Sequence, residues 1–64
     1  MDHSILAEVY ELLMNAEDNG YPQWDIDPTH VAEEIVEQTG FFEDMPIEEL
    51  SSYVEKAQRN YHDL

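Results

Sequence analysis

Apolar side chains recur every three or four residues over three stretches of this 64-residue chain. That spacing is typical of an α-helix, because it places the apolar side chains on one face of the helix. No useful length of the chain alternates apolar and polar residues with the period of two expected of a β-strand. The pattern predicts an all-α fold, a small three-helix bundle in a single domain spanning residues 1–64, with antiparallel neighbouring helices.

The first helix is expected over about residues 4–19, the second over about 28–39 and the third over about 46–63. Asp27 followed by Pro28 is typical of a helix cap and a first helical position, and Gly40 is a residue that commonly ends a helix. The residues at the centres of the three apolar faces form the expected core. They are Leu6, Val9, Leu13, Ile35, Leu50 and Val54.

The segment between the first two helices is rich in aromatic residues. Tyr21, Trp24 and Ile26 are too apolar for a fully solvated loop, so we expect this segment to lie across the bundle. It would then cover Tyr10 and Met14, which lie beside the main apolar face of the first helix. If it does not cover them, these two side chains form an exposed apolar ridge of the kind that marks a contact surface.

The charge of the chain is strongly unbalanced. Sixteen Asp and Glu residues stand against Lys56 and Arg59, which gives a formal net charge of −14. Repulsion among like charges destabilises a compact domain, and a chain of this length has only a few kcal/mol of stability to lose. We therefore interpret the acidity as functional, serving attraction to a basic protein surface and repulsion from nucleic acid and anionic membranes.

The carboxylates fall outside the apolar faces, on surfaces that we expect to contact the partner. Neighbouring carboxylates on a helix lie about 5–6 Å apart, a density comparable to that of DNA phosphates, which rise about 3.4 Å per nucleotide. The expected partner-binding residues are Glu8, Glu11, Asp18, Glu33, Glu34, Glu37, Glu43, Asp44, Glu48, Glu49 and Glu55.

In size, charge and compactness the whole chain resembles the small acidic DNA-mimic proteins of phages and other mobile elements, which include some anti-CRISPR and anti-restriction proteins. Those proteins share no fold and no residue motif. The resemblance implies an inhibitor in the cytoplasm of a host cell that occupies a nucleic-acid-binding surface of a host protein. From the charge itself we expect a monomer or a weak homodimer, because two chains with a net charge of −14 repel each other.

Two other functions remain open. A helical adaptor could bind a protein partner through an exposed apolar patch, with the acidity serving solubility; the candidate contact residues are Tyr10, Met14, Phe41 and Phe42, with Tyr53 as a further one. A halophile protein could carry the acids as an adaptation to high salt. Exposed apolar area in the folded monomer would favour the adaptor over mimicry, and folding only at molar salt would favour the halophile protein.

Enzymatic, metal and cofactor chemistry receive little support. There is no cysteine, no glycine-rich phosphate loop and no nucleophile motif, and three short helices rarely enclose a catalytic pocket. His3, His30 and His62 lack the spacing of metal ligands, and Asp25 opens a calcium-like pattern that fails at later positions. We expect a non-enzyme without metal or cofactor. With neither a basic, apolar leader nor an apolar run of about 20 residues, we also expect a cytoplasmic protein.

Overall fold

The fold consists of three α-helices in a computed structural model that describes residues 2–63. The helices are α1 (His3–Asp18), α2 (Pro28–Thr39) and α3 (Ile47–His62), and no strand occurs among the described residues. The predicted all-α, three-helix fold is confirmed. The second helix has the expected bounds, whereas α1 begins one residue earlier than expected and α3 one residue later.

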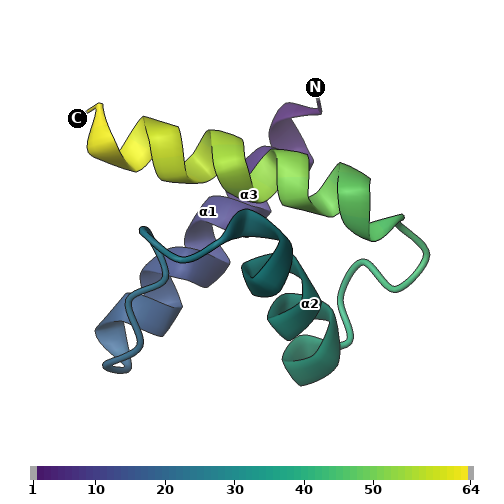
Figure 1. Cartoon of the computed structure of the whole chain (residues 1–64), viewed down its shortest axis with the longest axis horizontal. Coiled ribbons are helices and arrows are strands. Elements are labelled where there is room, and N and C mark those ends of the chain that lie inside the picture. The colour runs from purple at the N-terminus through teal and green to yellow at the C-terminus, as the bar shows by residue number, and fades with distance from the viewer. Residues whose placement is uncertain (1, 64) are drawn as a thin grey trace.

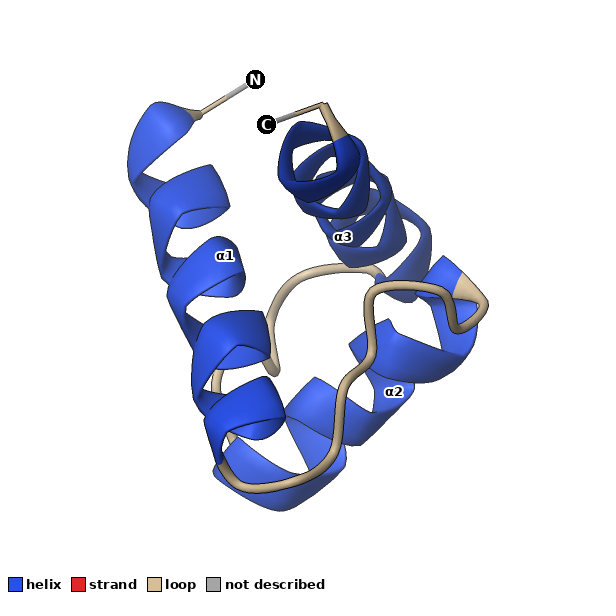
Figure 2. Cartoon of the chain, turned by 90° about the vertical axis from the view of Figure 1, so that its left-hand side faces the viewer, coloured by secondary structure: helices blue, strands red, loops and turns tan. Residues whose placement is uncertain are grey.

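The helices do not form a regular antiparallel bundle. Figure 1 shows α3 lying across α1 and α2. Accordingly, α3 packs against both other helices, while α1 and α2 have few contacts with each other. In Figure 2 the connection between α1 and α2 passes on the viewer's side of the molecule, between the two helices. The expectation of antiparallel neighbours was wrong because this connection contributes to the core, taking space that a helix would fill in a regular bundle.

Local signals in the sequence explain where the helices begin and end. The Asp2 carboxylate accepts a hydrogen bond from the backbone N–H of Ser4 at 2.8 Å and so caps α1. Asp27 caps α2 in the same way, accepting from the N–H of Thr29 at 2.8 Å. Gly40 ends α2 with a φ of 73°, a left-handed conformation that glycine adopts without steric cost.

The core lies where α3 crosses the other two helices. Five of the six expected core residues are buried, but Leu6 is only half-buried and packs at the edge of the core. Sequence reasoning placed Leu6 too far inside because α3 covers α1 at one crossing and not along its whole length. The buried apolar residues are Val9, Leu13, Trp24, Val31, Ala32, Ile35, Leu50, Tyr53, Val54 and Ala57.

The candidate contact residues that follow α2 differ in exposure. Tyr53, a candidate contact residue, is only 7% exposed, and its hydroxyl accepts a hydrogen bond from the backbone N–H of Asp2 at 3.1 Å, so it belongs to the core. Of the adjacent phenylalanines, Phe42 packs against the core with a φ of 65°, whereas Phe41 is 48% exposed. The left-handed backbone at Phe42 turns its side chain inward.

Candidate functional site

The outer face of α1 carries a continuous acidic ridge. Glu8, Glu11 and Asp18 follow one another at spacings of three and seven residues, and all three are exposed. The helix has four Asp and Glu residues and no Lys or Arg. No cationic side chain within α1 therefore reduces the negative potential of this ridge.

The acids of α2 divide between two surfaces. Glu33 and Glu37 are exposed on the outer face, four residues apart, as expected. Glu34 is half-buried, and its Oε2 accepts a hydrogen bond from Nε2 of Gln23 at 2.5 Å. The structure thus turns Glu34 toward the connection after α1, away from the two acids with which the sequence grouped it. Like α1, α2 contains no Lys or Arg.

Charge compensation is concentrated on α3. Both strong cations of the chain, Lys56 and Arg59, lie on this helix, and Arg59 forms an exposed ion pair with Glu55 at 2.9 Å. Glu48 and Glu49 are exposed in the first turn of α3, where the helix dipole favours negative charge. Among the described residues, an ion pair between a carboxylate and Arg therefore occurs on α3 and on neither α1 nor α2.

The connector between α2 and α3 extends the acidic surface and adds an aromatic ring. Glu43 and Asp44 are both exposed. The exposed Phe41 ring meets Phe42 edge to face, with the ring centroids 6.4 Å apart. Phe41 is thus the member of this pair that is available for a contact.

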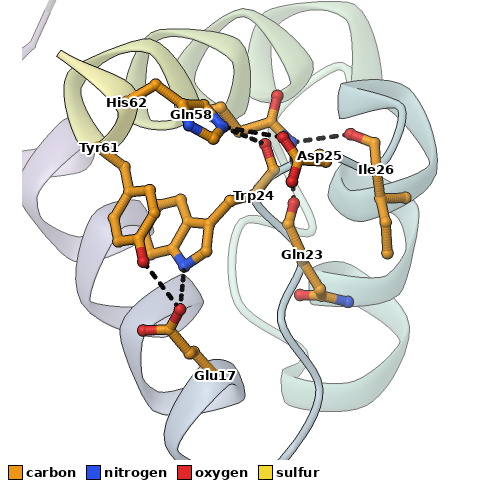
Figure 3. Close-up of polar contacts among 8 residues, drawn as sticks. All are labelled: Glu17, Gln23, Trp24, Asp25, Ile26, Gln58, Tyr61 and His62. Carbon is orange, nitrogen blue, oxygen red and sulfur yellow. Dashed lines mark hydrogen bonds and ion pairs between the residues drawn. The ribbon is translucent and has the colours of Figure 1, made fainter.

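Trp24 attaches the connection between α1 and α2 to α1 and α3 through packing and a hydrogen bond (Figure 3). Its indole stacks on the ring of Tyr61, and its Nε1 donates a hydrogen bond to Oε2 of Glu17 at 3.1 Å. The hydroxyl of Tyr61 donates to the same oxygen at 3.0 Å. One carboxylate of α1 thus holds two aromatic side chains, one from the connection and one from α3.

A second set of bonds joins this connection to the C-terminal half of α3. The side-chain amide of Gln58 donates to the backbone oxygens of Gln23 and Ile26 at 2.9 and 2.8 Å (Figure 3). Nε2 of His62 lies 2.9 Å from a carboxylate oxygen of Asp25. These bonds give the connection a fixed path over the molecule.

The environment of Tyr61 also changes its acidity. The hydrogen bond to Glu17 raises the pKa of the Tyr61 hydroxyl above its ordinary value, with smaller contributions from burial and from the negative charge of Glu17. The phenol would lose this bond as a donor if it ionised. This effect makes Tyr61 a reporter of the contact between α1 and α3.

Sequence reasoning did not single out Glu17, Gln58 or Tyr61 for these polar contacts. Gln58 did carry a signal, because it is a polar residue beside Ala57 and Val54 on the apolar face of α3. In the structure it is only 8% exposed, and its amide is satisfied by the connection. The role of Glu17 as a hydrogen-bond acceptor could not be recognised in the sequence, since its spacing does not distinguish it from the solvated acids of α1.

The expected cover over Tyr10 is present. Trp24 lies against it, with ring centroids 5.2 Å apart, and both Tyr10 and Met14 are half-buried against the core. The structure therefore does not leave these two side chains as a fully exposed ridge.

Among residues 2–63, no three His, Cys, Asp or Glu side chains gather as ligands for a metal ion. No helix in this part of the chain is long and apolar enough to cross a membrane. Comparison with known proteins finds no matching family model, no similar curated protein and no similar solved structure. The arrangement of charge and apolar surface is therefore the basis for proposing a function.

Proposed function

We propose that this chain is a non-catalytic binding protein that occupies a basic, nucleic-acid-binding surface of another protein. In its most concrete form it is a DNA mimic of the anti-CRISPR or anti-restriction type, encoded by a phage or another mobile element and acting in the host cytoplasm. It would inhibit by exclusion, because two negatively charged ligands compete for one cationic surface.

One observation carries the proposal. The four acids of α1 and the three of α2 have no Lys or Arg on their own helices, and both cations of the chain lie on α3. A solvated helix surface usually mixes the two signs, because opposite charges three or four residues apart stabilise a helix and like charges destabilise it. Glu33 and Glu37 form such a like-charge pair on an exposed face. Attraction to a basic partner would explain why α1 and α2 carry acids without compensating Lys or Arg.

The rigid packing of the connection supports the same proposal. A mimic must hold its carboxylates at fixed separations, since a flexible array would lose entropy on binding. The bonds of Glu17 and Gln58 fix the path between the two acidic helices.

A second candidate function, an adaptor that binds through apolar contacts, is favoured by one observation. Tyr21 and Phe41 are 72% and 48% exposed, which leaves two aromatic rings available to a partner. In that case the acids increase solubility and guide the encounter with the partner, and the affinity depends on the aromatic side chains more than on charge.

Capture of the partner followed by competition tests the proposal. Immobilised protein would be incubated with a host lysate, and proteins released by raising the salt concentration would be identified. We expect a nucleic-acid-binding protein that binds this chain and nucleic acid alternately. A captured partner that holds both at once would contradict competition, and retention through high salt with loss on Phe41→Ser would favour the adaptor.

A further inference from the structure

A groove lies between the C-terminal halves of α1 and α2. It encloses about 590 Å³ and is bordered by the connection that follows α1. It exists because α3 packs against both helices, while α1 and α2 have few contacts with each other. Its apolar lining comes from Leu12, Ala16, Tyr21 and Ile35.

The apolar lining is accessible to a ligand. Tyr21, at the edge of the groove, is 72% exposed. Leu12 and Ala16 are only half-buried on the α1 side. An apolar side chain of a partner could therefore remove apolar surface of all three residues from water.

The polar surroundings of the groove favour a cation. Glu34 lines it and carries the charge of α2 that faces α1. Asn19, the C-cap of α1, and Thr39, the last residue of α2, also line it, so the negative ends of two helix dipoles meet there. Neither helix has a basic residue in its last turn, whereas α3 has Arg59 and His62 in that position.

We propose that this groove binds a cationic amphipathic segment of a protein partner, with an apolar side chain between α1 and α2 and a Lys or Arg beside Glu34. Helix-in-groove recognition uses this combination of an apolar anchor and flanking charges. A second copy of this chain is a poor occupant, because each copy carries a net charge of −14. The inference goes beyond the competition proposed above, since it concerns the space between the helices and requires apolar contact as well as charge.

The test is an NMR titration of the isotopically labelled full chain with a synthetic helical peptide of about 14 residues, with Leu on one face and Lys on the other. A second peptide with Ser in place of Leu keeps the charge and removes the apolar anchor. We expect the Leu/Lys peptide to shift the backbone amide signals of Leu12, Ala16 and Thr39 most, and the Ser/Lys peptide to bind much more weakly. Equal binding of the two peptides, or largest shifts on the outer acidic faces, would overturn the proposal.

Two pairs of variants sharpen the test without disturbing the core. Tyr21→Ser removes an exposed ring that lines the groove, and Phe41→Ser removes an exposed ring outside it. We expect the first to weaken binding of the Leu/Lys peptide about fivefold or more and the second to leave it nearly unchanged. Glu34→Gln should weaken binding of the Leu/Lys peptide about threefold. Glu33→Gln changes the net charge by the same amount and should weaken that binding less.

Equal effects within either pair of variants would show that binding depends on overall charge or on non-specific apolar contact. That result would overturn the assignment of the groove as the binding site. A dilution series of the free protein completes the test. If the signals of the groove residues move with protein concentration, the groove is occupied by a second copy and the proposed occupant is wrong. We expect these signals to be independent of concentration.

Discussion

The indole ring of Trp24 lies flat on the ring of Tyr61, with centroids 4.0 Å apart and ring planes 3° from parallel. These residues are 37 positions apart in the sequence, and the carboxylate of Glu17 accepts a hydrogen bond from each. The stack and its shared acceptor join α1, the connection after it and α3. In a domain whose α1 and α2 have few mutual contacts, this junction fixes the connection between them against α1 and α3.

Replacing Glu17 with alanine should destabilise the fold. The N–H of Trp24, a residue only 4% exposed, would lose its acceptor, and an unsatisfied buried donor costs about 1–3 kcal/mol. Glu11→Ala is the matched control, since it removes one negative charge from the exposed face of the same helix. Urea denaturation should show a loss of stability for Glu17→Ala and little change or a small gain for Glu11→Ala. Equal free energies of unfolding for the two variants would show that Glu17 acts only through its charge.

Alkaline pH should weaken the same junction. The pKa of Tyr61 is raised in the folded state, so the folded protein holds the phenol proton more tightly than the unfolded chain does. The resulting stability is fully present below the ordinary tyrosine pKa of about 10 and is lost as the pH rises through the higher folded-state value.

Tyr61→Phe provides the control for this effect, because it keeps the ring and removes the hydroxyl. The difference in free energy of unfolding between the wild type and Tyr61→Phe should shrink as the pH is raised above about 10. Because the chain has four tyrosines, the difference in tyrosinate absorbance between the folded wild type and folded Tyr61→Phe would follow the ionisation of this phenol. A difference that stays constant across the alkaline range would contradict a coupling between the hydroxyl and Glu17.

Added salt should stabilise the domain. Repulsion among the exposed acids of α1 and α2 opposes folding, and at 0.15 M salt the Debye length is already as short as about 8 Å. We expect the melting temperature to rise with sodium chloride concentration. A melting temperature independent of salt would show that the acids are spaced to avoid one another. Folding only at molar salt would instead support adaptation to a saline environment.

Much of the fold could be predicted because the local signals are strong. Asp27 and Pro28 specify the start of α2, and Gly40 specifies its end, so the structure gives α2 its predicted bounds. The periodic placement of Val9, Leu13 and Val54 was enough to locate three core residues. Each of these signals acts within a few residues of the chain.

The cover of Tyr10 by the aromatic connection was predicted, but the polar partners that meet across the fold were not. Glu17 resembles every other acid of α1 until Trp24 and Tyr61 are placed beside it. Glu34 was grouped with Glu33, because helical periodicity alone does not show which neighbour a flank of a helix will face. The groove between α1 and α2 was likewise absent from the sequence pattern, since it follows from the way α3 crosses the other helices.

Charge reversal on α2 tests the central claim most directly. Glu33 and Glu37, the two exposed acids of α2, would be changed together to Lys, and the variant's ability to displace nucleic acid from the captured partner would be measured at several salt concentrations. The matching double Gln variant removes the charges without reversing them, and circular dichroism would verify that both variants stay helical. If the acids of this chain imitate a phosphate array, the Lys variant should no longer displace nucleic acid and the Gln variant should displace it weakly. Displacement by the wild type should also weaken steeply as salt rises. Undiminished displacement by the folded Lys variant would contradict the account.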